Sequence, residues 1–154
     1  MSVELREITS GTLRAIIGLT VAPRQRRFVA PNAVSLAEAL FSDEAWYRGV
    51  WRGDDPVGFV MLEDETMQEN PPSDPEIGLW RLMVDRRHQG RGIGRAIVEQ
   101  VAAMARARGF SHLRTSYVVA KGGPEGFYRS LGFKPTGKID DDEVVAALAL
   151  GDTA

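Results

Sequence analysis

The sequence predicts a single α/β domain, in which a mixed β-sheet of about six to seven strands carries helices on both faces. The order of the elements indicates this fold, because β-rich runs lie before, between and after the helical segments. A strand–helix–strand unit within residues 77–119 predicts a right-handed parallel crossover. With 154 residues, the chain is long enough for one domain with a substantial core and too short for two, so we expect residues 1–154 to form one domain.

The first half of the chain combines β-rich runs with short amphipathic segments. Helix-starting residues such as Thr12 and Pro23 precede the amphipathic segments. The polar stretch 52–56 contains glycine and proline, which is typical of a hairpin turn. The predicted strands are residues 3–8, 46–51 and 57–62, and the predicted helical segments are residues 13–19, 24–29 and 35–41.

The second half is organised around residues 77–95. The apolar run 77–84 predicts a buried strand, a charged turn follows it, and a helix with one apolar face begins near Ile93. Gly109 is suited to the left-handed position after a helix and predicts where this helix ends. The remaining predicted elements are a strand at residues 113–119, a helix at 124–131, and a hairpin of strands at 133–138 and 143–150.

The composition excludes several functional classes. The net charge of −2 argues against non-specific nucleic-acid binding. The chain has no cysteine and only two histidines, His88 and His112, so we expect no disulfide, no thiolate nucleophile and no metal site. No apolar run approaches the roughly 20 residues of a membrane span, and the first residues lack a signal-peptide pattern. We therefore expect a cytoplasmic protein that contacts neither nucleic acid nor membrane.

Glycine and arginine alternate between the predicted buried strand and the long helix that follows it. Residues 89–95 read Gln-Gly-Arg-Gly-Ile-Gly-Arg, and we call this segment the anion cradle. Free backbone N–H groups and the helix dipole favour a phosphate there, and glycine lets it approach the main chain. The segment lacks the Lys-Ser/Thr of a Walker loop and the acid that follows in a dinucleotide-binding unit. A glycine-rich turn that only reverses the chain is the alternative.

Gln89, Gly92 and Gly94 resemble the acetyl-CoA motif of the GNAT N-acetyltransferase family, Gln/Arg-x-x-Gly-x-Gly/Ala, and the order of elements is similar to that family over nearly the whole chain. The resemblance implies acetyl-CoA as co-substrate, no metal, and a backbone oxyanion donor near Met83 or Val84. Dimers are common in the family, which makes a homodimer an expectation. The cofactor-binding residues that it implies are Leu82, Met83, Val84, Gln89, Gly90, Arg91, Gly92, Ile93, Gly94, Arg95 and Tyr128.

A second motif, Phe127-Tyr128-Arg-Ser-Leu-Gly-Phe133, resembles the other signature of the same family. The resemblance makes Tyr128 the catalytic acid that protonates the departing thiolate. The chain departs from the family at Lys121 and Pro124, where Asn and Ala are frequent, which puts the usual Asn contact to the cofactor in doubt. The alternative is that Tyr128, like Phe127 and Phe133, belongs to the core.

Charge is distributed unevenly around the cradle. The arginines that we expect on the cofactor side are Arg81, Arg86, Arg87, Arg91 and Arg95, whereas residues 63–80 carry six acids and no Lys or Arg. This asymmetry favours a cationic acceptor, and a solvated acidic loop is the alternative. Residues 21–39 and 79–85 look like bacterial spermine/spermidine acetyltransferases, which implies a polyamine acceptor. The resemblance also makes Glu76 the candidate catalytic base. Acetylation of a protein, and a non-catalytic acyl-CoA sensor, remain alternatives.

Overall fold

The computed structural model describes residues 2–151 as one seven-stranded sheet with the strand order β1-β2-β3-β4-β5-β7-β6. The α/β fold with a mixed sheet is confirmed. The strands are β1 (Glu4–Arg6), β2 (Ala45–Arg52), β3 (Asp55–Asp64), β4 (Ile77–Val84), β5 (His112–Tyr117), β6 (Lys134–Asp140) and β7 (Glu143–Ala149). The helices are α1 (Leu13–Ile17), α2 (Asn32–Ala39), α3 (Ile93–Ala107) and α4 (Glu125–Ser130), with 3-10 turns η1 (Pro23–Gln25), η2 (Glu65–Met67) and η3 (Arg86–His88).

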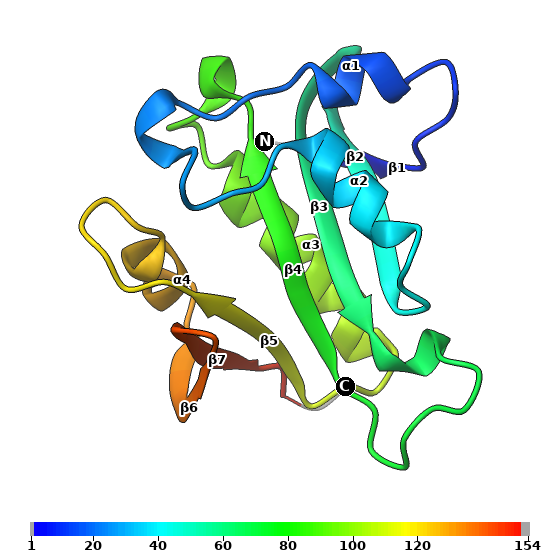
Figure 1. Ribbon diagram of the computed structural model, residues 1–154, viewed down its shortest axis with the longest axis vertical. Helices are drawn as coiled ribbons and strands as arrows, with labels where there is room; N and C mark the ends of the chain where they lie inside the picture. Colours follow the sequence, from blue (N-terminus) through cyan, green and yellow to red (C-terminus); the bar gives the residue numbers. More distant parts are fainter. Residues whose placement is uncertain (1, 152–154) are drawn as a thin grey trace.

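Helices cover both faces of the sheet, as Figure 1 shows. α3 lies behind β4, and its apolar stripe packs with the sheet residues Val60, Leu62 and Leu113 into the larger core. α1 and the segment before α2 lie on the opposite face, where Ile16 packs against Phe59 and other residues in a second core. Each face of the sheet around β3 and β4 therefore packs against its own set of helices.

The sheet opens in its middle, between β4 and β5. These two strands run parallel but pair only at Gly78 with Arg114 and at Leu79 with Thr115. Beyond these pairs the strands diverge, as the green and olive strands of Figure 1 show. An irregular register in the β3–β4 ladder pairs Met61 with Arg81 and Leu62 with Leu79, so β4 carries one extra residue there. Such a bulge bends and twists a strand, which helps to turn β4 away from β5.

The N-terminal helices differ from their predicted bounds. α2 begins at Asn32, and not at Ser35, because Pro31 supplies the fixed φ that starts a helix. The buried amide of Asn32 donates to the carbonyl of Ile16 at 2.9 Å, so it ties α2 to the end of α1. Only one 3-10 turn forms after Pro23. The end of α3 fits the sequence, with Gly109 at φ +90° after it, whereas the hairpin strands run closer to their turns than predicted, to Arg52 and from Asp55 in the first hairpin and to Asp140 in the last.

Candidate functional site

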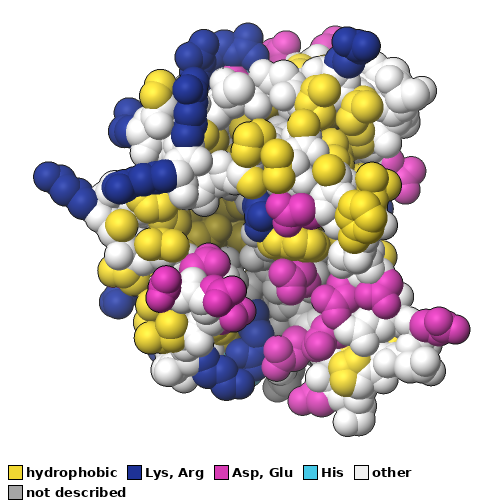
Figure 2. All heavy atoms as spheres, viewed as in Figure 1, with side chains coloured by type: hydrophobic (Ala, Val, Ile, Leu, Met, Phe, Trp, Pro, Cys, Tyr) yellow, Lys and Arg dark blue, Asp and Glu magenta, His cyan; other side chains and the backbone are white. Residues whose placement is uncertain are grey.

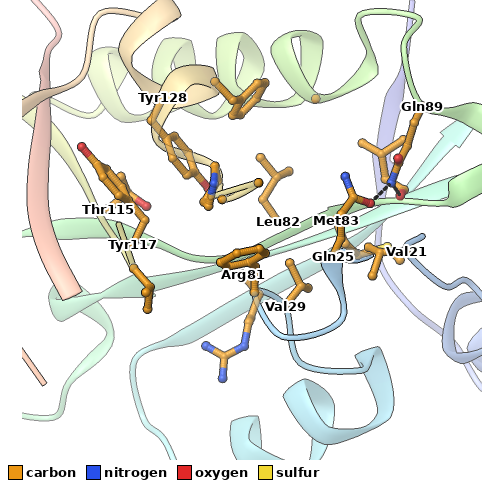
Figure 3. A pocket seen from close by; sticks show the side chains of 18 of the residues that line it. Val21, Gln25, Val29, Arg81, Leu82, Met83, Gln89, Thr115, Tyr117 and Tyr128 are labelled. Carbon is orange, nitrogen blue, oxygen red and sulfur yellow. Dashed lines mark hydrogen bonds between the residues drawn. The ribbon is translucent and has the colours of Figure 1, made fainter. Parts of the chain in front are cut away.

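A cavity of about 910 Å³ lies at the opening between β4 and β5. Its walls come from the segment before α2, the end of β4, the start of α3, the end of β5 and α4, and Figure 3 shows it from close by. All predicted cofactor-binding residues line it except Arg91. Arg26, Arg27 and Phe28 also line it, and the sequence analysis did not assign them to the site. The cluster Arg24, Arg26 and Arg27 was the available signal, since adjacent cations are typical of phosphate sites.

The glycines of the anion cradle have different roles. Gly90 and Gly92 have φ of +76° and +79°, and a Cβ added at either one would meet nothing within 4 Å. Gly92 is the N-cap residue of α3, so the helix begins on an open space lined by backbone N–H groups. Gly94 has no positive φ, and its added Cβ would lie 3.2 Å from the ring of Phe127. Gly94 therefore allows α4 to pack on α3.

Gln89 connects the cradle to two other segments. Its Nε2 donates to the carbonyl of Val84 at 2.9 Å and to Oε1 of Gln25 at 2.8 Å, the contact drawn as a dashed line in Figure 3. Oε1 of Gln25 also accepts from the backbone N–H of Ala22 at 3.2 Å. The Gln89 side chain thus holds the end of β4 and the segment before α2 together, which fixes two walls of the cavity.

Asp85 anchors the turn that precedes the cradle. Its buried carboxylate accepts from the backbone N–H of Thr20 at 3.0 Å, the backbone N–H of Arg87 at 3.2 Å and Nε of Arg87 at 2.8 Å. Burial alone would raise its pKa, but the hydrogen bonds from Arg87 and Thr20 outweigh burial and hold the pKa of Asp85 below its usual value. The turn is therefore fixed by an ionised buried carboxylate.

Arg81 lines the cavity, but its guanidinium is held by an acid of α2 and not by the cradle. Its guanidinium donates to both carboxylate oxygens of Glu38 in α2 at 3.3 Å and lies over the ring of Trp80. Figure 3 shows its side chain pointing away from Tyr128 and Gln89. The sequence could not show this pairing, because the extra residue in β4 changes which face the strand side chains take.

Tyr128 lies in the inner wall of the cavity with only 8% of its surface exposed. Its ring stacks on that of Tyr117 with a centroid distance of 5.7 Å, and Phe127 and Phe133 meet it edge-on at 5.2 and 5.4 Å. Burial raises the pKa of Tyr128 to about 12, and the nearby polar side chain of Thr115 opposes that rise. Tyr128 is therefore a neutral phenol at physiological pH.

Thr115 places this phenol beside the point where the sheet opens. The Thr115 hydroxyl donates to the carbonyl of Leu79 at 3.3 Å, in the last residue pair that joins β4 to β5. The Tyr117 hydroxyl is buried and has no hydrogen-bond partner among the described residues, although it lines the cavity. Buried hydroxyls are normally paired, so a group bound in the cavity or a water is the expected partner. The sequence analysis missed both residues.

The end of β4 directs backbone N–H groups toward the opening, while the carbonyl of Val84 is taken by Gln89. The N–H of Asp85 donates to Val57 in β3 at 2.8 Å, and the Met83 carbonyl lies against Gly58 of β3. Because successive residues of a strand direct their backbone groups to opposite neighbours, Leu82 and Val84 direct theirs away from β3 and toward the opening. The backbone N–H groups of Leu82 and Val84 are thus the donors that this part of the cavity offers.

Glu76 lies outside the set of residues that line the cavity, at the opposite end of β4. Its carboxylate pairs with Arg114 at 2.9 Å and is half exposed. Asp64 is likewise neutralised, by Arg108 at 2.9 Å. The structure thus brings Tyr128 together with the cradle but not with Glu76.

A different set of acids faces the hollow of the molecule. Partial desolvation raises the pKa of Glu63, and the negative charges of Glu44, Asp140 and Glu65 act in the same direction, against Arg81. Figure 2 shows acidic side chains on both sides of a hollow, over the end of β3 and over the β6–β7 turn, with Lys and Arg gathered above η1. We call Glu44, Glu63, Glu65 and Asp140 the acidic rim.

Comparison with protein families gives one decisive match. The model described as acetyltransferase (GNAT) domain matches residues 43–135, more than half of the chain. The chain belongs to the GNAT acetyltransferase family. Among solved structures, the GNAT domain of S. lividans PAT has a TM-score of 0.73 with 17% identity, over 96% of this GNAT chain and 89% of that chain. PaiA N-acetyltransferase from Thermoplasma acidophilum, solved in complex with coenzyme A, has a TM-score of 0.67 with 16% identity, over 97% and 99%. These likenesses confirm the GNAT fold.

Two of three curated relatives of this GNAT chain are named for different acceptors. N-acetyltransferase 8B of Homo sapiens is 35% identical over 53% of the chain and 34% of its own length. Peptidyl-lysine N-acetyltransferase YjaB of Salmonella typhimurium is 31% identical over 59% and 51%. Spermine/spermidine N(1)-acetyltransferase of Bacillus subtilis is 25% identical over 70% and 74%. The chain thus spans about a third to a half of the length of the first two.

The described residues fit acetyl-CoA better than a metal. The open space at Gly92 and the unpartnered buried hydroxyl of Tyr117 leave room and a donor for a bound thioester cofactor. Within residues 2–151 no group of three or more His, Cys, Asp or Glu side chains is arranged to hold a metal ion. None of the helices in this part of the chain has the length and apolarity needed to cross a bilayer.

Proposed function

We propose that the chain is an acetyl-CoA-dependent N-acetyltransferase that acts on a small cationic amine, with polyamines as the lead acceptors. One observation carries the proposal: a single cavity joins the anion cradle to Tyr128 at the opening of the sheet. A diphosphate at one end of this cavity and a thioester at the other suit the shape of acetyl-CoA. The family membership supports the same reaction class.

The outer end of the cavity is suited to the cofactor phosphates. The start of α3, a helix of 15 residues, directs its first free N–H groups and its positive dipole end to the open space at Gly92. Arg26, Arg27 and Arg95 line the same end of the cavity and add positive charge. Acetyl-CoA bound there supplies the activated acetyl group.

The inner end has groups suited to acyl transfer. The N–H groups of Leu82 and Val84 face the opening and would stabilise the negative charge that develops on the acetyl oxygen. The Tyr128 hydroxyl would donate to the sulfur as the C–S bond breaks. With a pKa of about 12, this phenol is fully protonated and always available as a donor at neutral pH.

The same pKa limits how Tyr128 can act. A thiol has a pKa of roughly 8.5, so full proton transfer from an isolated phenol of pKa about 12 to the thiolate would be uphill by about 5 kcal/mol. Tyr128 therefore relays a proton only if it regains one from the reacting amine in the same step. Otherwise it stabilises the thiolate through a hydrogen bond.

The acidic rim supports a cationic acceptor. Glu63 has a raised pKa because partial desolvation and nearby carboxylates crowd its negative charge, and a bound cation would relieve that crowding. Asp140 at the end of β6 acts through its charge on Glu63 at the end of β3, so a molecule with two or more ammonium groups could contact both carboxylates. The similarity to the B. subtilis spermine/spermidine enzyme supports a polyamine.

A lysine side chain of a protein is the second candidate acceptor. It is favoured by the similarity to the peptidyl-lysine enzyme of S. typhimurium. A lysine places one ammonium group at the end of a flexible stem, so it needs only one side of the rim.

A panel of acceptors tests the proposal. The chain, acetyl-CoA and one amine at a time (spermidine, putrescine, a lysine amide, and a lysine-containing peptide) are combined, and free thiol and acetylated product are measured by thiol titration and mass spectrometry. Thiol release with spermidine or putrescine above the peptide supports the lead acceptor. The reverse order supports the protein acceptor. Tight acetyl-CoA binding with no release for any amine would reveal a non-catalytic sensor.

A further inference from the structure

The carboxylate of Glu143 is placed unusually among the described acids. Within residues 2–151, it is the only carboxylate among the residues that line the cavity. Glu143 is the first residue of β7 and is half-buried. Its Oε1 lies 3.4 Å from the hydroxyl of Ser116 on β5. Neither the family match nor the resemblances in the sequence assign it a role.

Strand pairing shows on which face of the sheet this carboxylate lies. Tyr117 pairs with Val144 and Ser116 pairs with Val145 across β5 and β7. Tyr117 belongs to the core on the α3 and α4 face, where it stacks on Tyr128. Because side chains alternate along a strand, Ser116 and Glu143 lie on the opposite face. Tyr128 and Glu143 therefore approach the end of β5 from opposite faces of the sheet.

No cation of the described residues neutralises Glu143. Its carboxylate forms no ion pair within 4.0 Å in residues 2–151, whereas Glu76 is held by Arg114. The adjacent turn residues Asp140, Asp141 and Asp142 add further negative charge. A carboxylate without a cation, half-buried beside an open cavity, attracts an ammonium group and shares a proton with it.

We propose that Glu143 binds the ammonium group of the acceptor and takes its proton, with Ser116 holding the carboxylate. This inference rests on the proposed function. Glu143 accepts one proton from the ammonium, and the nitrogen lone pair freed in this way forms the C–N bond to the acetyl carbon. As the C–S bond breaks, the second N–H proton passes to the sulfur, through or beside the Tyr128 hydroxyl. Glu143 then returns its proton to water, so the products are the amide, the free thiol and one proton.

Three variants test this assignment: Glu143→Gln, Asp142→Asn and Glu76→Gln. Asp142 is exposed, next to Glu143, and has φ +68°, which asparagine tolerates, so it is a matched control for the loss of one charge at the turn. With the best amine of the panel, we expect Glu143→Gln to lower kcat/KM for the amine by about 100-fold. The Kd for acetyl-CoA, measured by calorimetry, should stay within about twofold of wild type.

A change of acceptor separates proton transfer from general damage. A fluorinated analogue of the amine has a lower pKa and is largely neutral at the assay pH, so it needs no base. The defect of Glu143→Gln should therefore shrink at least about tenfold with this analogue. A distorted site would lower turnover of both amines equally, which would overturn the proposal. If Glu143→Gln does not fold, Glu143→Asp, which retracts the carboxylate by one methylene, is measured in its place.

The outcomes also separate this inference from the proposed function. If wild type turns over an amine and Glu143→Gln behaves like Asp142→Asn, the inference is wrong and the proposed function stands. If Glu76→Gln alone abolishes turnover, Glu76 is the base and Glu143 is not. If wild type binds acetyl-CoA but acetylates no amine, both are wrong.

Discussion

Replacing Tyr128 with phenylalanine removes one oxygen atom from the inner wall of the cavity and keeps the ring. The three aromatic contacts of the ring, to Tyr117, Phe127 and Phe133 at 5.2 to 5.7 Å, remain possible in the variant. Stability should change by about 1 kcal/mol at most, because the packing of the ring is kept and one polar group less is buried. Turnover should fall about 10²–10⁴-fold, or about 3–5 kcal/mol in barrier, because the departing sulfur loses its proton donor.

The measurement combines thiol release at saturating substrates with thermal melting and acetyl-CoA calorimetry. Tyr47→Phe is the matched control, since Tyr47 is a half-buried tyrosine of β2 that packs against the second core and is not among the residues that line the cavity. We expect Tyr47→Phe to keep most of the wild-type kcat. Turnover of Tyr128→Phe above about half of the normal rate would show that Tyr128 is a core residue and that the proton comes from water.

The Tyr128 phenol also predicts how kcat and stability depend on pH. A phenol of pKa about 12 stays in the donor form through the whole neutral range, so deprotonation of Tyr128 should not lower kcat below about pH 11. The folded pKa lies above the ordinary value of 10.0, so the folded state binds this proton more tightly than the unfolded state. The resulting stability is complete below pH 10 and should be lost as the pH rises toward about 12. Denaturant titrations at alkaline pH, in wild type and Tyr128→Phe, measure this difference.

Three further outcomes are expected. Gly92→Val should weaken acetyl-CoA binding well over tenfold in calorimetry, whereas Gly137→Val, at a similar positive φ of +93° far from the cavity lining, should not. Asp85→Asn should cost about 2–3 kcal/mol in urea unfolding at pH 7, and the difference from wild type should vanish as the pH falls below 3.8 and through the lowered folded pKa. The double variant Glu63→Gln, Glu44→Gln should raise the KM for a polyamine and weaken the dependence of that KM on salt, while the Kd for acetyl-CoA stays unchanged. Equal changes for both substrates would show that these carboxylates are only solvated surface charges.

Much of the fold and the cofactor end of the site followed from local sequence signals. The strand before Asp85, the glycines of the cradle and the helix after Gly92 form a contiguous segment, so their order along the chain already places them together in space. Tyr128, which lines the cavity, was predicted as a site residue because its motif has a fixed spacing. Patterns of this kind lie within short segments of the chain. They can therefore be recognised in a single sequence without knowledge of long-range contacts.

The acceptor side could not be predicted in the same way. Glu143 and Ser116 lie in contact because β7 inserts between β5 and β6. No local sequence pattern predicts this strand order. The surroundings of Glu76 were hidden for a related reason, since the sequence does not show that this carboxylate pairs with Arg114 at the end of β4 away from the opening. The partners of Arg81 depend on the extra residue in β4, and a bulge has no reliable sequence signature.

Only two residue pairs, those between β4 and β5, join the two parts of the sheet by backbone pairing in the described residues. On either side of this seam, strands β1 to β4 and strands β5 to β7 form separate antiparallel ladders, and within residues 2–151 the seam has backbone pairing only at Gly78 and Leu79. The two halves of the sheet can therefore open locally at this short seam. The amide protons of Leu82 and Val84 should exchange with solvent faster than amide protons deeper in the ladders.

A ligand whose carbonyl and amide groups reach Leu82 and Val84 would act as the missing strand and join the halves. At 100 times its Kd, such a ligand would stabilise the domain by about 2.7 kcal/mol. Slower exchange at these two amides on ligand addition would show this closure directly. Because the free domain has an open sheet, binding of a ligand in the cavity should make the whole sheet more rigid.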